Sequence, residues 1–418
     1  MNKENSVVIT GLGAVSPIGI GTDEFWDSLI TRKSGVQIRE ALQETDCPLK
    51  LYSPVTGFDG KQWVRPRKAL KVMCRPIQFG YTAATMAIEQ AGLADSGLEP
   101  ERLGTVFGSE TFFADPMEVA SVFRKCVTDQ NYDHDRWGEF AMREIQPLWM
   151  LKYLPNMVTS HISIAADARG PSNSICQGEA SGTLALIEGA DLIVRGACDA
   201  VIVGGTGSQV ALSGMLYRGV QSISKRIDQP DAAVRPFDRE RDGTVYGEGS
   251  GAIVLENSHH AKQRGAKVLA TLSAWSRSFR PFGNEDFQQA IAENIRNTMQ
   301  IGELETDEIA HVSAHGCAAQ EADKYEAKAI DGTLGQVPVV ANKSNYGELG
   351  PGGSALEMIS SVMSLNEKLI PPTLNFETPD TDCPVNVNST PEKCEKNAAL
   401  KVSFSSTGQI ACAAIRRE

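Results

Sequence analysis

The chain has 418 residues, and 41% of them are hydrophobic, which is enough to bury one large core or two fused ones. The formal net charge of -12 argues against nucleic acid and anionic membranes as partners, because both reward clustered Lys and Arg. Nine cysteines without CxxC or Cys/His metal spacing predict reduced thiols of a cytoplasmic protein and no metal site.

The chain begins with the run MNKENSVVITGLG, which predicts a strand over residues 6–13. This start lacks a basic segment followed by a long apolar run, so we expect no signal peptide. Nowhere do about eighteen uncharged apolar residues follow one another, and we therefore expect no membrane-spanning helix.

Short β-branched runs alternate with longer helical patterns along the rest of the chain. They predict further strands over residues 104–109, 199–207, 249–256, 308–316, 337–342, 400–408 and 410–417. The runs are apolar throughout rather than alternating, as expected of strands that are covered on both faces. The sequence therefore predicts an α/β fold in which helices cover a sheet.

A polar helical pattern, NSHHAKQRGAK at 257–267, follows Glu256 and precedes a second set of strands that begins at Val268. We therefore divide the chain into an N-terminal half, 1–256, and a C-terminal half, 257–418. Each half has a strand, helix, strand plan of similar order, which hints at an internal duplication.

The stretch SICQGEASG, residues 174–182, is built like a strand that ends at a sharp elbow and opens into a helix. Enzymes often hold a nucleophile at such an elbow, and Glu179 stands there in this chain. A carboxylate at a helix N-terminus is stabilised by roughly 0.3–1 kcal/mol without any chemical role. Cys176, three residues earlier, is expected to be a small buried hydrophobe on the strand rather than a displaced nucleophile.

Six longer motifs follow one another along the chain: VVITGLGAVSPIG, LPNMVTSHISIAADARGPSNS, VRPFDRERDGTVYGEGSGAIVLE, HHAKQRGAK, ANKSNYGELGPGGSALEMISSVMSL and LIPPTLNFETPD. In this order they resemble the β-ketoacyl synthases that depend on an acyl carrier protein, from about Val7 to Ile415. The resemblance implies the thiolase-like fold, with two fused βαβαβαββ halves stacked in five layers (αβαβα), and a dimer.

An active member of that family needs an elbow cysteine, two histidines, a lysine and a Gly-rich loop near the C-terminus. The resemblance puts Glu179 in place of the cysteine and identifies His315 and Lys343 with the first histidine and the lysine. Lys343 and Glu326 also match positions of a buried ion-pair network in the family. It puts Glu348 in place of the second histidine and Ser406 in place of a gating phenylalanine. Three coordinated losses predict that the chain has no intact condensing site.

Within the family, this pattern resembles the chain-length factors of type II polyketide synthases, also called ketosynthase β subunits. These keep the fold, lose the cysteine, usually to Gln, and pair with a catalytic ketosynthase α. The resemblance implies a heterodimer whose tunnel sets polyketide chain length. It also implies an acyl carrier protein, docked mainly on the partner, that carries the phosphopantetheine, so that this chain needs no cofactor.

Two alternatives stay open. The chain could be a decarboxylating ketosynthase-like enzyme that acts on malonyl groups of the carrier protein through Glu179 and His315. The missing second histidine weakens this alternative, because an oxyanion-type donor is worth about 2.7–4 kcal/mol. The chain could also be an acyl-binding homodimer that kept the tunnel without a partner.

By the same resemblance, SETFFADPMEVASVF at 109–123 corresponds to a helix that reaches the subunit interface and lines the tunnel. The candidate tunnel or interface residues are Phe112, Phe113, Met117, Ser121 and Cys176. The alternative for the four helical candidates is ordinary core packing of an amphipathic helix.

Overall fold

The computed structural model describes residues 6–219 and 222–417, and its centre is an eleven-stranded mixed sheet. The first half contributes, in spatial order, β8 (Ser172–Ile175), β5 (Leu103–Gly108), β9 (Ala200–Ser208), β10 (Glu248–Asn257) and β1 (Val7–Ser16). The second half contributes β13 (Val339–Val340), β12 (Ile309–Ser313), β16 (Ala398–Phe404), β17 (Gln409–Arg416) and β11 (Ala270–Phe279). The short β2 (Gly19–Ile20) pairs with β1.

Both halves have the same strand order, namely third, second, fourth, fifth and first along the chain. In each half the first three of these strands run parallel, and the last two join antiparallel. The halves meet where β1 pairs antiparallel with β11. This repeated topology confirms the predicted thiolase-like fold class, whereas the division between residues 256 and 257 stays a prediction.

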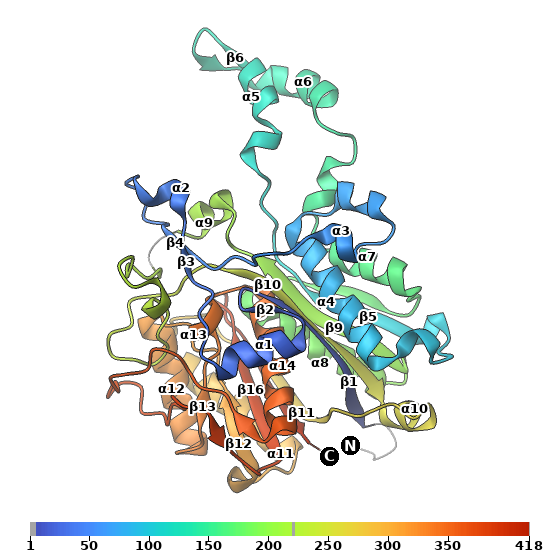
Figure 1. Ribbon diagram of the computed structural model, residues 1–418, viewed down its shortest axis with the longest axis vertical. Coiled ribbons are helices and arrows are strands. Elements are labelled where there is room, and N and C mark those ends of the chain that lie inside the picture. The colour runs from blue at the N-terminus through green and yellow to red at the C-terminus, as the bar shows by residue number, and fades with distance from the viewer. Residues whose placement is uncertain (1–5, 220–221, 418) are drawn as a thin grey trace.

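Helices and strands alternate in five layers, and the strands of each half form one of these layers (Figure 1). The helices of these layers are α4 (Arg75–Ala91), α7 (Met157–Ala166), α8 (Ser181–Val194), α14 (Pro351–Glu367), α11 (Phe287–Ile301) and α12 (Gln320–Leu334). Helices α8 and α14 contact the strands of both halves and form the central layer, whereas α4 and α7 cover the first half and α11, with α12 against it, covers the second. The central helices are buried almost all round, and α14 carries the buried Glu357 among its apolar and small residues.

The remaining short elements join these layers. They are α1 (Thr22–Ile30), α2 (Glu40–Gln43), α3 (Gly60–Trp63), α9 (Leu212–Arg218), α10 (Ser258–Gln263), α13 (Lys343–Tyr346), β3 (Gln37–Ile38), β4 (Leu51–Tyr52), β14 (Leu369–Ile370) and β15 (Glu392–Lys393). Within the described ranges, no helix is both long enough and apolar enough to cross a bilayer.

Residues 114–153 leave the body as a projecting arm, seen at the top of Figure 1, and return to it at the last element of the arm, which contacts η2 (Arg67–Val72) and α7. The arm consists of η5 (Pro116–Glu118), α5 (Ala120–Lys125), β6 (Val127–Thr128), β7 (Asn131–Tyr132), η6 (His134–Arg136), α6 (Trp137–Glu144) and η7 (Trp149–Tyr153). The prediction of one helix over 109–123 is therefore wrong. Pro116 pushes Asp115 into an extended conformation, with ψ of 120°, and only Ala120–Lys125 is α-helical.

The central layer depends on glycines where helix and strand backbones meet. A Cβ on Gly205 of β9 would lie 2.1 Å from the carbonyl oxygen of Pro351, at the start of α14. A Cβ on Gly182 of α8 would lie 2.5 Å from the same oxygen. Because both contacts are with backbone, no side-chain rotation relieves them.

We predict that Gly205→Ala lowers the free energy of unfolding by about 1–3 kcal/mol, because the added methyl pushes α14 off the sheet. The measurement is urea denaturation of the full chain. The matched control is Gly138→Ala in α6, where a Cβ meets no atom within 4 Å and stability should stay equal or rise by up to about 1 kcal/mol. An unchanged midpoint for Gly205→Ala would contradict this account of the packing.

Candidate functional site

The predicted elbow is present between β8 and α8. Strand β8 ends at Ile175, and the chain turns at Gly178, whose φ of 63° lies in the left-handed region that favours glycine. The Ser181 hydroxyl donates to the Gly178 carbonyl at 2.6 Å and accepts from the Gln177 N–H at 2.8 Å. These bonds set Glu179 in a single 3-10 turn, η8 (Gly178–Ala180), directly before the buried helix.

The Glu179 side chain is half-buried and reaches across to the other half of the molecule. Its Oε2 atom accepts a hydrogen bond from the Ser406 N–H at 3.1 Å. Ser406 lies in the tight turn between β16 and β17, which is closed by the Gly408 N–H donating to the Ser405 carbonyl at 2.9 Å. The fold thus brings together two candidate positions that are 227 residues apart in the chain.

His315 and Lys343, the two residues that the resemblance retains, are in direct contact inside the protein. The Lys343 Nζ atom lies 3.1 Å from His315 Nδ1 and 2.7 Å from the His315 carbonyl oxygen. An ammonium is only a donor, so Nδ1 accepts, and we assign the ring proton to Nε2. Burial lowers the pKa of His315 well below its usual value, and the charges of Lys343 and Lys401 add to this effect. His315 is therefore neutral.

Glu348 is an ion-pair partner of Lys343. Its Oε2 lies 3.6 Å from Nζ, and its Oε1 accepts from the Gly350 N–H at 2.9 Å. Burial raises the pKa of Glu348 to about 7, although the charge of Lys343 opposes this shift; the charge of Glu179 adds to it. The position that the resemblance assigns to a histidine donor is thus held by a carboxyl group that accepts.

A second buried pair, Glu357 and Lys401, completes this network and was missed by sequence reasoning. Glu357 Oε1 lies 3.2 Å from Lys343 Nζ, and Glu357 Oε2 lies 2.7 Å from Lys401 Nζ. Burial raises the pKa of Glu357, but the two ammonium groups outweigh burial and lower it overall. The available signal was a lysine inside an apolar strand run, because lysines are almost never fully buried unless they are paired.

Glu326, which the resemblance assigns to the buried network, binds the backbone of the His315 loop with its side chain. Its two carboxylate oxygens accept from the His315 N–H at 2.6 Å and the Gly316 N–H at 2.8 Å. Burial raises its pKa to about 7 against these two bonds. Glu326 therefore orients the histidine rather than pairing directly with Lys343.

Cys176, the cysteine that precedes the elbow, is not an activated thiol. Cys176 lies just beyond the end of β8 and is exposed, so the expectation of a buried cysteine on the strand is wrong. Strand β8 is the edge of the sheet, and within the described chain it pairs only with β5. Although the residue as a whole is exposed, partial desolvation of its thiol raises the pKa of Cys176, and the charge of Glu110 adds to this shift, whereas a nucleophile needs a lowered pKa.

The predicted tunnel residues separate into three environments. Phe112 is buried in the core of the first half, and Phe113 is half-buried with its ring 5.2 Å from that of Tyr217. Met117 and Ser121 are exposed on the arm. Their roles toward a growing chain stay predictions. Among the residues that the structure describes, no group of His, Cys, Asp and Glu side chains has the arrangement of a metal site.

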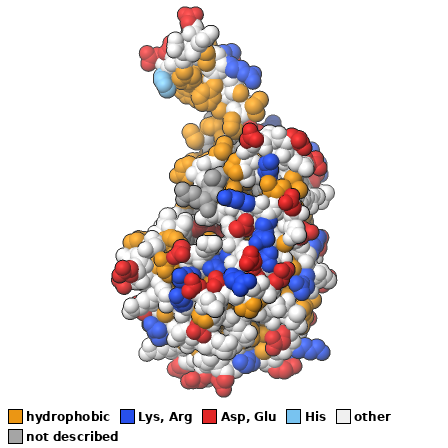
Figure 2. Space-filling view, turned by 90° about the vertical axis from the view of Figure 1, so that its left-hand side faces the viewer, with side chains coloured by type: hydrophobic (Ala, Val, Ile, Leu, Met, Phe, Trp, Pro, Cys, Tyr) orange, Lys and Arg blue, Asp and Glu red, His pale blue; other side chains and the backbone are white. Residues whose placement is uncertain are grey.

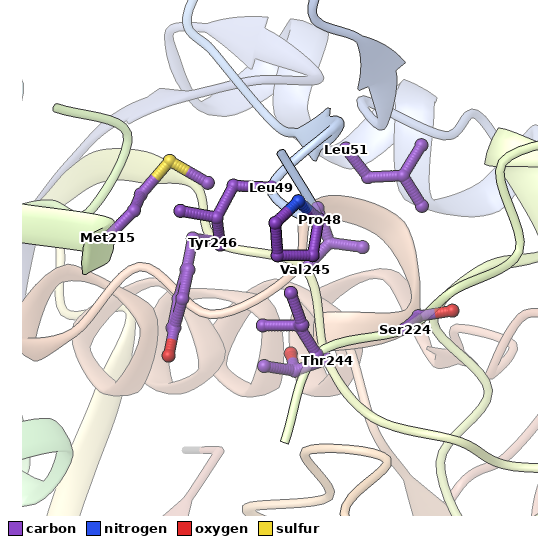
Figure 3. Close-up of a pocket in the computed structure, with 9 residues that line it drawn as sticks. Pro48, Leu49, Leu51, Met215, Ser224, Thr244, Val245 and Tyr246 are labelled. Carbon is purple, nitrogen blue, oxygen red and sulfur yellow. The ribbon is translucent and has the colours of Figure 1, made fainter. Parts of the chain in front are cut away.

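A small pocket lies against Met215 of α9 (Figure 3). Leu49, Leu51, Met215 and Tyr246 give it an apolar lining. Burial raises the pKa of Tyr246, and although the charge of Arg218 opposes the shift, the carboxylates of Glu348 and Glu179 add to it. The Tyr246 ring lines the pocket, and its hydroxyl donates to the Gly219 carbonyl at 3.4 Å.

Comparison with known proteins identifies the family. A model of the β-ketoacyl synthase N-terminal domain matches residues 4–261, and a model of the C-terminal domain matches residues 276–377. The chain belongs to the β-ketoacyl synthase family. The 3-oxoacyl-[acyl-carrier-protein] synthase 2 of Vibrio cholerae is 30% identical to it, with 90% of each chain covered.

Two solved structures of the family are also similar. The ishigamide ketosynthase/chain length factor has 24% identity and a TM-score of 0.86, with 99% of each chain covered, which shows the shared fold. A type II polyketide synthase acyl carrier protein in complex with its ketosynthase bound to the hexaketide has 25% identity and a TM-score of 0.83, again with 99% of each chain covered.

We predict that Glu348→Gln removes a pH-dependent cost of folding. With a pKa of about 7, the folded chain keeps a proton that an unfolded Glu loses near pH 4.3, so the wild type loses stability as pH rises between these values. The free energy of unfolding of the variant should exceed that of the wild type by about 1–3 kcal/mol at about pH 8 and nearly equal it at about pH 4.

The control is Glu139→Gln on the exposed face of the arm, which should show no such dependence. Urea denaturation at both pH values makes the comparison. A Glu348→Gln variant that is less stable than the wild type at about pH 8 would mean that the ion pair with Lys343 outweighs the burial of the carboxylate.

Proposed function

We propose that this chain is a non-condensing chain-length factor that pairs with a catalytic ketosynthase α in a type II polyketide synthase. The observation that carries the proposal is the hydrogen bond from the Ser406 N–H to Glu179. By the family resemblance, the elbow position belongs to the nucleophile, and the loop N–H belongs to the thioester oxygen. In this chain the carboxylate of Glu179 takes the place of the nucleophile and also accepts the hydrogen bond of the loop N–H.

The second support is the ion pair of Glu348 with Lys343. Condensation and decarboxylation both need donors for a developing enolate oxygen. A carboxylate at this position accepts hydrogen bonds and neutralises the lysine instead. The polar network thus serves the stability of the site and leaves the condensation step to a partner.

The charges at the elbow also argue against the decarboxylase alternative. A malonyl group carries a carboxylate, and it would meet the carboxyl groups of Glu110, Glu179 and Glu348. Their charges act on one another, since Glu179 contributes to the raised pKa of both Glu110 and Glu348. Juxtaposed like charges can cost several kcal/mol at a binding site, so an anionic extender is disfavoured here.

The arm and the edge strand support a heterodimer. Within the described chain, β8 pairs only with β5, which leaves one edge open. Figure 2 shows that apolar side chains gather on the arm. The large exposed apolar residues of the arm are Met117, Phe123, Val127, Met142, Leu148 and Met150. Met142 is 89% exposed. Exposed apolar patches of this kind mark protein interfaces, and we infer that the ketosynthase α covers both features.

We predict that the purified chain alone does not condense malonyl and acyl groups on a carrier protein, and that it co-purifies one-to-one with a cysteine-bearing ketosynthase. The paired variant Met142→Lys with Met150→Lys should weaken the complex by about tenfold or more. The control is Ile301→Lys, at an exposed apolar position in α11 away from the arm. Condensation by the chain alone would refute the proposal, and a stable homodimer that ignores the ketosynthase would favour the acyl-binding alternative.

We further predict that Glu179→Ala leaves release of carbon dioxide from malonyl-carrier protein at the background rate, as in the wild type. Radiolabelled malonyl groups provide the measurement, and a catalytic ketosynthase is the positive control. Release above background by the wild type, abolished in the variant, would instead support the decarboxylating enzyme.

A further inference from the structure

Glu110 and Arg218 form an ion pair beside the elbow that neither the motifs nor the family resemblance explains. The Glu110 side chain is 9% exposed and that of Arg218 is 20% exposed. Glu110 Oε1 also accepts from the Ser208 N–H at 2.9 Å. Replacing a buried ion pair by apolar residues is often neutral or stabilising. Stability alone therefore does not account for this pair.

The guanidinium of Arg218 lies against an aromatic wall. Its Cζ atom is 5.5 Å from the centre of the Phe113 ring, which in turn contacts the Tyr217 ring. The approach depends on Gly214 of α9, because a Cβ there would lie 3.0 Å from the Phe113 ring and 3.1 Å from Arg218 Nη1. This wall is accessible, since Tyr217 is 79% exposed.

Arg218 keeps donors to spare. Within the described ranges, its hydrogen bonds go to the Glu110 carboxylate and, at 3.4 Å, to the Gly214 carbonyl. A guanidinium has five N–H groups and no acceptor. The remaining donors suit a ligand that brings acceptor oxygens.

The pair is within electrostatic reach of the elbow. Burial raises the pKa of Glu110, and although Arg218 opposes the shift, the charge of Glu179 adds to it. Burial raises the pKa of Tyr246, the charge of Arg218 opposes this shift, and the charge of Glu179 adds to it. A Cβ on Gly350, two residues after Glu348, would lie 3.0 Å from Glu110 Oε2, so the pair lies beside the Glu348 turn.

We propose that Arg218 binds the carbonyl oxygens of a β-keto acyl chain that lies along Phe113 and Tyr217, and that Glu110 holds the guanidinium in position for it. A β-keto chain presents a carbonyl at every second carbon, whereas a saturated chain would leave the guanidinium donors unpaired. Sites built to hydrogen-bond a ligand discriminate strongly against analogues that lack the polar group. The inference deepens the proposed function by naming the class of chain, and it rests on that function for the source of the chain.

The test compares two probes, acetoacetyl-pantetheine and butyryl-pantetheine, titrated by calorimetry into the full chain and into its complex with the ketosynthase. We expect acetoacetyl-pantetheine to bind at least about tenfold more tightly, which corresponds to one well-placed hydrogen-bonded group. Arg218→Met should reduce this preference to less than about twofold. Glu110→Gln should reduce the preference only in part, because the neutral amide still contacts the guanidinium but holds it in position less firmly.

The matched control is Arg143→Met, which removes an exposed arginine of the arm and should leave the preference unchanged. Equal affinity of the two probes for the wild type, or a preference that persists in Arg218→Met, would overturn the inference. If Arg218→Met does not fold, Arg218→Lys takes its place and should reduce the preference, since an ammonium lacks the planar fork of donors.

Co-purification with the ketosynthase separates this inference from the proposed function. The Arg218→Met variant should still co-purify with the ketosynthase, and only its preference for acetoacetyl-pantetheine over butyryl-pantetheine should be lost. A wild-type chain that prefers the β-keto probe but condenses by itself would refute the chain-length-factor role and leave the binding role of Arg218 intact.

Discussion

The buried ammonium of Lys343 is the constraint around which the site is arranged. A charge removed from water is costly unless carboxylates and hydrogen-bond acceptors surround it. Glu348 and Glu357 provide the carboxylates, and the His315 carbonyl accepts at 2.7 Å. Two carboxylates face one ammonium, and Lys401 balances the charge of the second one, Glu357. Burial and the two ammonium groups keep His315 neutral, and Glu348 pairs with Lys343 instead of donating a hydrogen bond as a histidine would.

At the elbow, too, a charged side chain is stabilised by a polar partner, but there the side chain is only half-buried. Glu179 has no ion-pair partner among the described residues, but it accepts from a backbone N–H in the facing turn. Gly178 makes the turn possible, and the close packing of α8 against α14 at Gly182 keeps both halves in register. The two halves therefore meet at a polar contact between Glu179 and Ser406, where an active family member would bind a thioester.

Much of the fold and part of the site followed from local sequence. The apolar runs predicted the long strands, and the elbow motif predicted β8, the turn and α8. The helix over 109–123 failed because Pro116 interrupts a pattern that is otherwise amphipathic, and only a short helix follows it. The prediction that Cys176 is buried was wrong because a residue at a strand end is buried only where a neighbouring element covers it, and β8 is the edge strand of the sheet.

By itself, the sequence determined the strands along the chain and the elbow, because these depend on local pattern, and its resemblance to the family identified the residues at the family's positions. Only the tertiary structure decided which of those residues touch. The contact of Glu179 with Ser406, the pairing of Lys401 with Glu357 and the pair of Glu110 with Arg218 join residues far apart in the chain. Charges and hydrogen bonds act over a few ångströms, and the distance between such residues is set by the packing of the layers.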